Sequence, residues 1–456
     1  MARKYEMDMT TGALLPKIIR FSIPLMLSSL LQLLYNAADV VVVGRFVGDT
    51  ALAAVGSTGS LIALITNVFM GLSIGTGVLV AQYFGAGDDE HMEQVVHTSI
   101  AVGLLGGAFL TVVGIVLARP ILQVMGSPED VIDQAELYIR IFFGGMIANL
   151  TYNFGAAVLR SVGDTQRPLY ILAVTGLVNV GLNLLLVIVF RLGVAGVAIA
   201  TIVSQILSCI AVLVLLMRAK GSIHFEWRQL RIHMPTLGRM LRVGLPAGLQ
   251  GTIFSISNVI IQSGVNSFGS VVVAGSAAAA NLEGFVYVAM NALYQTALTF
   301  AGQNVGAGKF DRIRRILACC VCSVAVVGVV LGALAYFNGG TLLQLYTTSP
   351  EVIAAGLQRM LYVCLPYFLC GIMDVMVGML RGLGCSIVPM CVSIAGVCGV
   401  RIVWIYTIFR AVHTPEALYI SYPISWTITA VIHIVCFAVI YRRMRRQHAQ
   451  AVGLAA

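Results

Sequence analysis

The stretch that decides the fold runs from Pro24 to Phe46, PLMLSSLLQLLYNAADVVVVGRF, and Asp39 is its only acidic residue. An apolar run of about 20 residues crosses the roughly 30 Å hydrocarbon layer of a bilayer as a helix. A charge at that depth is costly and usually has a function or a partner. The stretch therefore predicts a membrane-spanning helix, over residues 17–44, that carries a functional carboxylate.

The rest of the 456-residue chain has the same character, because 59% of its residues are apolar and only 10% are charged. Ordinary soluble domains contain about 25% charged residues, so a water-soluble core could not bury this much apolar surface. The composition predicts an all-α polytopic membrane protein of about twelve transmembrane helices. The further helices are expected over residues 50–83, 91–118, 131–160, 166–190, 193–218, 243–267, 271–304, 309–337, 350–382, 386–410 and 416–441.

The second half of the chain repeats the first at an offset of about 221 or 222 residues. The matching pairs are Pro24 with Pro246, Phe46 with Phe268, Gln82-Gly85-Ala86-Gly87 with Gln303-Gly306-Ala307-Gly308, Ser127-Pro128-Glu129 with Ser349-Pro350-Glu351, and Arg160, Gly163 and Pro168 with Arg381, Gly384 and Pro389. Each copy has an even number of crossings, so the two copies have the same orientation. Such parallel repeats are typical of transporters, whose site opens to either side in turn.

The predicted domains are an N-terminal lobe over residues 1–218, a cytoplasmic linker over 219–242, a C-terminal lobe over 243–441 and a basic tail over 442–456. The net charge of +9 supports this topology. Lys and Arg gather in alternate connections, for example at Arg3 and Lys4, in 218–242, in 309–315 and in 442–446, whereas the opposite connections hold only Arg45, Arg119, Arg191 and Arg410. Basic residues prefer the cytoplasmic side, so both termini are expected in the cytoplasm. The positive charge therefore indicates membrane topology rather than a nucleic-acid partner.

The sequence offers no chemistry for a cofactor or a reaction. All ten cysteines follow residue 208 and nearly all lie in apolar segments, which argues against disulfides and against a metal site at Cys319 and Cys322. The glycine-rich turns at 85–87 and 306–308 lack the Walker spacing of a nucleotide site. Clustered histidines and paired carboxylates of an intramembrane enzyme are missing as well. We expect no enzyme activity, no cofactor and no bound metal.

Of the 19 acidic residues, only Asp39, Glu283 and Asp374 fall within predicted helices and away from their ends. Tyr35 and Asn36 precede Asp39 by four and three residues, so they share its helical face. All three buried acids are candidates for function, and Asp39 is the strongest.

Polar residues from two later helices lie at a similar depth to Asp39. At about 1.5 Å per residue, Asp39 lies about 8 Å from the outer end of its helix, Asn183 about 10 Å, Thr201 about 12 Å and Asn179 about 17 Å. A carboxylate with amide and hydroxyl groups can hold Na⁺ or a proton. Hydrogen bonding that merely joins the helices is the alternative interpretation.

The C-terminal half offers further candidates for substrate binding or gating. Arg401 lies deep in its helix and needs an acidic partner; Glu283, at a similar depth, is the expected one, ahead of Asp374. Tyr152, Asn153, Tyr287, Met290 and Tyr294 are candidate lining residues for an apolar drug pocket, although ordinary helix packing would also explain them.

These residues resemble a known family. Tyr35, Asp39, Asn179, Asn183 and Thr201 look like the N-lobe cation site of the MATE (multidrug and toxic compound extrusion) transporters of bacteria, DinF/NorM-like. Asp39-Val-Val-Val-Val-Gly44, Gln82-Tyr-Phe-Gly-Ala-Gly87, Gln303-Asn-Val-Gly-Ala-Gly308 and Leu159-Arg-Ser-Val-Gly-Asp-Thr165 are similar to recurring segments of that family. The helix over 243–267 lacks the acidic residue of the NorM branch, so coupling is expected to depend on Asp39.

The resemblance implies a V-shaped pair of lobes in the bacterial inner membrane and a monomeric antiporter that exports organic cations or amphipathic drugs in exchange for H⁺ or Na⁺. A flippase of lipid-linked saccharides, from the wider superfamily, is the nearest alternative and would favour a strongly basic cavity. A major facilitator transporter is disfavoured, because Asp88-Asp89-Glu90-His91 stands where its basic motif is expected. Besides the small-molecule substrate, the expected partner is membrane lipid.

Overall fold

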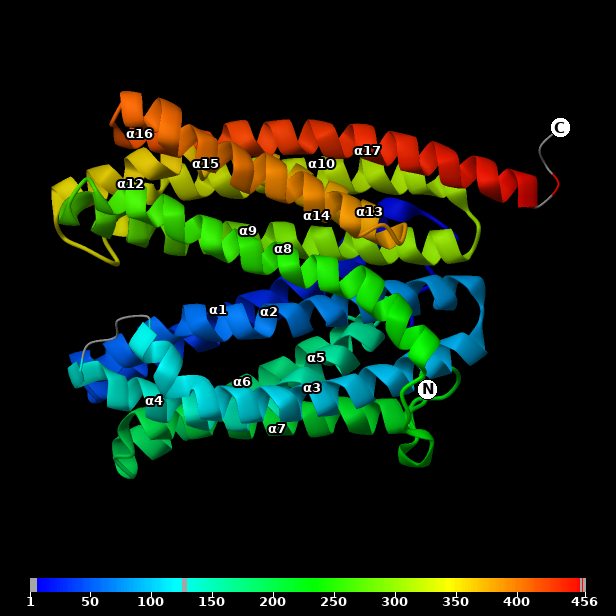
Figure 1. Cartoon of the computed structure of the whole chain (residues 1–456), viewed down its shortest axis with the longest axis horizontal. Coiled ribbons are helices and arrows are strands. Elements are labelled where there is room, and N and C mark those ends of the chain that lie inside the picture. The colour runs from blue at the N-terminus through cyan, green and yellow to red at the C-terminus, as the bar shows by residue number, and fades with distance from the viewer. Residues whose placement is uncertain (1–5, 125–128, 452, 454–456) are drawn as a thin grey trace. The chain divides into compact units, whose positions relative to one another are not determined.

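The computed structural model describes residues 6–124, 129–451 and 453, and in these ranges every regular element is helical (Figure 1). Eleven helices are long and apolar enough to cross a membrane, and the bent pair α4 and α5, which meet at 49°, makes a twelfth if counted as one span. The predicted all-α membrane fold is therefore confirmed. Arg3, Lys4, Ser127 and Pro128 lie outside the described residues.

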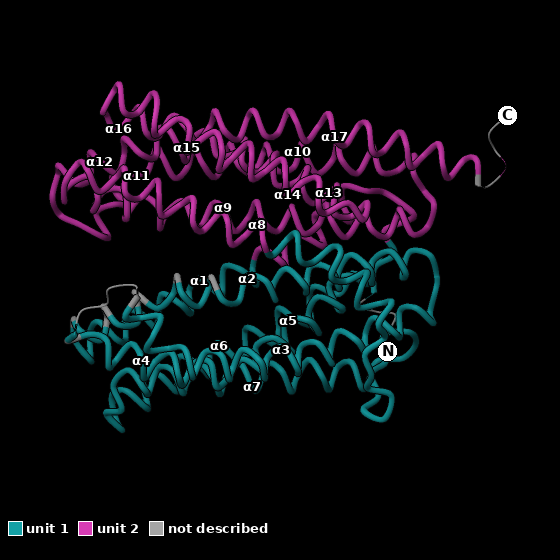
Figure 2. Tube along the Cα trace, viewed as in Figure 1, with its two compact units in different colours: residues 1–8, 27–248 teal, residues 9–26, 249–456 magenta. Residues whose placement is uncertain are grey.

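The chain divides into two compact units (Figure 2). Unit 1 comprises residues 1–8 and 27–248, and unit 2 comprises residues 9–26 and 249–456. The division does not fall between the repeats. Helix α1 (Leu14–Phe46) and helix α8 (Met234–Asn266) each belong partly to both units, and their internal prolines, Pro24 and Pro246, lie two residues before the points where the assignment changes.

In unit 1, α2 packs against α3, α4 and α5, and α7 packs against α4, α5 and α6. The bounds are α2 (Asp49–Ala86), α3 (Asp89–Val124), α4 (Glu129–Gly144), α5 (Met146–Ser161), α6 (Gln166–Leu184) with the π-helical turn η2 (Leu185–Val189), and α7 (Gly193–Arg218). The start of α8 packs against α2 through glycines: a Cβ on Gly244 would lie 2.6 Å from the Cα of Leu72. Small residues permit this close approach of two helices within a membrane.

In unit 2, α9 is central and packs against α10, α12 and α13, while α17 packs against α13. The bounds are α9 (Ser270–Gly306), α10 (Phe310–Phe337), α11 (Gly339–Leu343), α12 (Pro350–Tyr362), η4 (Leu365–Tyr367), α13 (Phe368–Gly382), α14 (Ile387–Ser393), η5 (Ile394–Gly399), α15 (Val400–Trp404), η6 (Ile405–Phe409), α16 (Pro415–Tyr419) and α17 (Ser421–Ala451). Residues 9–12 join this unit, because Met9 is fully buried and its backbone bonds to Gln303 and Asn304.

The repeat is visible in the backbone. Gly48, Gly87 and Gly163 have φ values of 119°, 68° and 95°, and their counterparts Gly269, Gly308 and Gly384 have 88°, 67° and 85°. Residues with a Cβ rarely adopt this left-handed region, so glycine is required at each turn. The same turns therefore separate the same helices in both halves.

Two connections differ from expectation. Helix α8 begins at Met234 rather than at 243, so the connection between the halves is shorter than the predicted linker over 219–242, and its residues Ile223 and Phe225 pack into the core of unit 1. Helix α17 continues to Ala451 instead of ending at 441. Arg445 there forms an ion pair with Asp311 at 2.9 Å.

Candidate functional site

The N-terminal half brings Asp39 of α1, Asn183 of α6 and Thr201 of α7 together. Asn183 Nδ2 donates a hydrogen bond to Asp39 Oδ1, and Thr201 Oγ1 donates to Asp39 Oδ2 at 3.5 Å. Asn183 Nδ2 also donates to Asn179 Oδ1 at 3.3 Å, one helical turn away. Four of the predicted residues thus form one cluster, the Asp39 cluster (Asp39, Asn179, Asn183 and Thr201).

The position of Asp39 follows from the apolar residues after it. Val42 and Val43 are buried in a small core with Val187 of η2 and Val197 of α7. Burying these valines turns that face of α1 toward α6 and α7 and carries Asp39, three residues before Val42, with it. Asn183 lies just before the π-helical turn η2, a kind of turn that often marks functional sites.

The carboxylate of the Asp39 cluster has no basic side chain as a partner among the described residues. Asp39 is 9% exposed, and no Lys, Arg or His in the described ranges forms an ion pair with it. Asn183 Oδ1 is buried and has no hydrogen-bond partner among the residues that the structure describes. The cluster therefore has the oxygen atoms, and the unbalanced negative charge, that a small cation or a proton would complement.

The other predicted residues of this half lie apart from the carboxylate. The ring of Tyr35 packs on Gly176, where a Cβ would lie 1.8 Å from Tyr35 Cε2, and its hydroxyl donates to the Ala173 carbonyl at 3.3 Å. Asn36 is exposed. On α5, Tyr152 is buried with its hydroxyl lacking a partner, and Asn153 donates to the Asn149 carbonyl at 2.8 Å.

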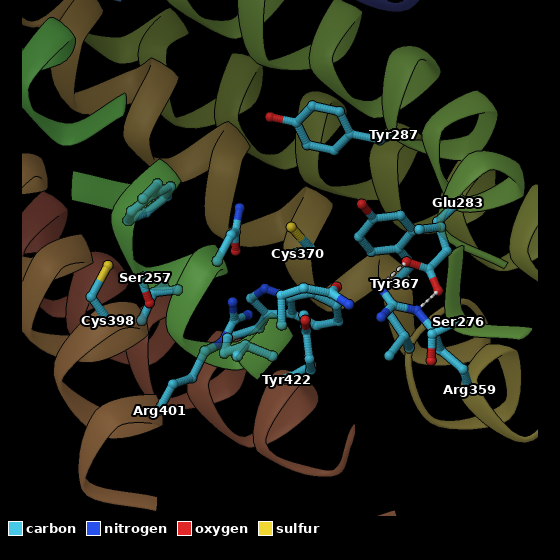
Figure 3. A pocket seen from close by; sticks show the side chains of 18 of the residues that line it. Ser257, Ser276, Glu283, Tyr287, Arg359, Tyr367, Cys370, Cys398, Arg401 and Tyr422 are labelled. Atoms are coloured by element: carbon cyan, nitrogen blue, oxygen red, sulfur yellow. Dashed lines mark hydrogen bonds and ion pairs between the residues drawn. The ribbon is translucent and has the colours of Figure 1, made fainter. Parts of the chain in front are cut away.

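The C-terminal half contains a cavity of about 440 Å³, a volume suited to a small organic ligand (Figure 3). Its charged lining residues are Glu283 of α9, Arg359 of α12, Asp374 of α13 and Arg401 of α15; its aromatic lining residues are Phe254, Tyr287, Tyr367, Tyr422 and Trp426. The charges are thus mixed rather than strongly basic.

The expected pairing of Arg401 with Glu283 is wrong. Glu283 instead forms two hydrogen bonds of 2.9 Å with Arg359, one from Nε and one from a terminal nitrogen (Figure 3). The reason is packing: α12, which carries Arg359, lies against α9, whereas α15 lies against α17. Arg359 and Arg401 lie at nearly the same depth, about 14 Å from the outer ends of their helices, so depth could not distinguish them.

Arg401 interacts with residues that the sequence interpretation missed. Its Nε donates to Ser425 Oγ at 3.0 Å, and its guanidinium carbon lies 4.2 Å from the ring centroid of Tyr422 and 5.6 Å from that of Trp426. All three partners belong to α17. Tyr422 and Trp426 are spaced one helical turn apart in the sequence. Aromatic residues are so common in membrane helices that this spacing alone did not predict a contact with Arg401.

The remaining candidates of this half divide between the cavity and the interior. Tyr287 and Asp374 line the cavity. Met290 is fully buried and packs near Gly371, and the Tyr294 hydroxyl accepts a hydrogen bond from Arg381 at 2.6 Å. Tyr294 therefore serves an internal hydrogen-bond network.

Comparisons with known proteins identify the family of the chain. The family model MatE matches residues 24–185 and again 246–407, once in each half. Probable multidrug resistance protein YoeA of Bacillus subtilis (strain 168) is 30% identical over 389 residues, which cover 84% of each chain. Probable multidrug resistance protein NorM of Thermotoga maritima is 22% identical over 402 residues, covering 85% of this chain and 84% of that protein.

The fold also matches solved structures. A MOP superfamily transporter from Pyrococcus furiosus superposes with a TM-score of 0.90 at 21% identity, over 96% of this chain and 98% of that one. The paired halves, the membrane-spanning helices and the two matches to one family model lead to the same conclusion. The chain belongs to the MATE family of multidrug efflux transporters and is a multi-pass membrane protein.

Proposed function

We propose that this MATE family member is a secondary active antiporter that exports organic cations or amphipathic drugs in exchange for H⁺ or Na⁺. The observation that carries the proposal is the Asp39 carboxylate, which is 9% exposed in a membrane-spanning helix and has no ion-pair partner in the described part of the chain. Such a carboxylate is stabilised by a proton or a small cation. Its loaded and empty states then favour different helix arrangements, as alternating access requires.

The hydrogen bonds of the Asp39 cluster suggest how loading is transmitted. Ionised Asp39 accepts hydrogen bonds from Asn183 and Thr201, which join α1 to α6 and α7. A proton turns one of its oxygens into a donor, and Na⁺ competes for both, so either one weakens these bonds. Asn183 Oδ1, which lacks a partner, is an acceptor for the proton or a ligand for the ion once the amide turns.

Helix α1 is suited to respond to this change. Pro24 lies inside the helix and removes one backbone hydrogen bond, which eases bending there. We therefore infer that loading of Asp39 repositions α1, changes the shape of a substrate cavity in the N-terminal lobe and releases the substrate outward.

The relatives quoted above support drugs as the substrate class, because both curated proteins are named as multidrug resistance proteins. They also favour an exporter over a lipid-linked saccharide flippase. Their bacterial origin and the positive-inside pattern support a place in the inner membrane with both termini in the cytoplasm. The family resemblance suggests a monomer.

The test is gradient-driven transport of ethidium, a fluorescent organic cation, into everted membrane vesicles. An imposed pH gradient is compared with an imposed Na⁺ gradient for the wild type, Asp39→Asn and the matched control Asp89→Asn, which removes an exposed carboxylate from the first turn of α3. We expect one of the gradients to drive transport in the wild type and the control, and neither in Asp39→Asn.

Full gradient-driven transport by Asp39→Asn would show that coupling does not depend on this carboxylate. Wild-type vesicles that move no cation under either gradient would instead favour a lipid-linked substrate. The pair of gradients also identifies the coupling ion.

A further inference from the structure

The guanidinium of Arg401 in the cavity of the C-terminal half (Figure 3) has no ion-pair partner within the described ranges. Arg401 is 4% exposed and lines the cavity. Its Nε donates a hydrogen bond to Ser425 Oγ; within the described ranges Arg401 makes no other hydrogen bond, and no carboxylate lies within ion-pair distance of it. A guanidinium carries five N–H donors, so most of its hydrogen-bonding capacity is unused.

Two of the other three charges of the cavity balance each other. Glu283 and Arg359 neutralise each other through two hydrogen bonds of 2.9 Å. Asp374 of α13 also lines the cavity and, like Arg401, forms no ion pair within the described ranges. Arg401 is therefore the basic lining residue that the described residues leave without an ion pair, and the wall of the cavity around it offers positive charge to an anion.

The neighbours of Arg401 determine what kind of anion fits. Tyr422 and Trp426 contact the guanidinium by cation–π interactions, and Tyr367 stacks on Trp426 with ring centroids 5.3 Å apart. These rings form an aromatic wall beside the charge, in which Tyr367 stacks on Trp426 and Tyr422 meets Trp426 edge-on at 69°. A planar guanidinium pairs best with a carboxylate, which it binds through two parallel hydrogen bonds.

We propose that the cavity of the C-terminal half is a binding site for aromatic organic acids, with the carboxylate on Arg401 and the aromatic ring against Tyr422, Trp426 and Tyr367. The site lies in the C-terminal half of the chain, whereas the Asp39 cluster lies in the N-terminal half. It would add organic anions to the organic cations proposed as ligands of this protein. It does not depend on the proposed coupling through Asp39.

The test compares three naphthalene probes that differ only in the group attached to the ring: 1-naphthylacetate is an anion, 1-naphthaleneethanol is neutral and 1-naphthylmethylammonium is a cation. Binding to the full chain in lipid nanodiscs is measured by calorimetric titration at constant salt. The variants are Arg401→Gln and Arg410→Gln; the latter removes an exposed guanidinium from the end of the same helical segment.

For the wild type we expect 1-naphthylacetate to bind at least tenfold more tightly than the alcohol, with the ammonium probe weakest. Arg401→Gln should abolish the preference for the anion and leave the Kd of the alcohol nearly unchanged. Arg410→Gln should retain the preference. Quenching of tryptophan fluorescence by bound probe should be lost in Trp426→Phe, which locates the ligand in the cavity.

Equal binding of the three probes by the wild type, or preference for the ammonium probe, would overturn the proposal without requiring any variant to fold. An anion preference that survives in Arg401→Gln would overturn it as well. If Arg401→Gln does not fold, Arg401→Lys replaces it: the charge is kept but the two parallel hydrogen bonds are lost, so the preference should fall yet remain.

Discussion

The Glu283–Arg359 ion pair yields a prediction whose size follows from the structure. The side chains are 7% and 9% exposed, and two hydrogen bonds of 2.9 Å join them. Removing one partner leaves an unpaired buried charge, which costs about 3–5 kcal/mol. We expect Glu283→Gln and Arg359→Gln each to lower the free energy of unfolding by about that amount. The double variant should cost at least about 2 kcal/mol less than the sum of the single variants.

The assay is reversible unfolding in mixed detergent micelles, followed by the helical circular dichroism signal. The two single variants and the double variant form a double-mutant cycle. A second double-mutant cycle, which combines Glu283→Gln with Arg401→Gln, is the control, because the structure places no ion pair between those residues. Its effects should add to within about 0.5 kcal/mol. A larger coupling of Glu283 to Arg401 than to Arg359 would refute the pairing and the argument from helix packing.

Other parts of the structure give sharper mutational tests. Asn183→Leu should reduce gradient-driven ethidium transport more than Thr201→Val, because the Asn183 amide is the closer donor to Asp39 while the Thr201 hydroxyl is 3.5 Å away; equal losses in the vesicle assay would contradict this. Gly176→Ala should destabilise the protein by about 1–3 kcal/mol, since its Cβ would lie 1.8 Å from the Tyr35 ring, and Tyr35→Ala should restore part of the loss in the same unfolding measurement. Gly244→Ala should lower the thermal unfolding midpoint because of its contact with Leu72, whereas Gly238→Ala on the same helix meets nothing within 4 Å and should leave the midpoint unchanged or raise it.

Most of the Asp39 cluster could be predicted from sequence, because the depth of a residue in the membrane follows from its position along its own helix. Asp39, Asn183 and Thr201 were placed at similar depths by counting residues, and the three side chains do meet. Tyr35 was expected beside Asp39 because it lies one turn away on the same helix. The structure turns its hydroxyl to the Ala173 carbonyl instead, since Gly176 leaves room for the ring on α6.

The sequence by itself determined the class of the protein: long apolar runs require helices in a bilayer, and a constant offset between matching residues requires two similar halves. Glycines at the turns keep that repeat detectable in the sequence, because residues with a Cβ rarely adopt those backbone angles.

Only the tertiary structure decided which charges meet. Arg359 and Arg401 have the same depth and the same chemistry, yet α12 lies against α9 and brings Arg359 to Glu283, while α15 lies against α17 and leaves Arg401 among Ser425, Tyr422 and Trp426. The depth of a residue follows from its position along one helix. Its partner on another helix depends on how all the helices pack together, so the partner could not be predicted by counting residues.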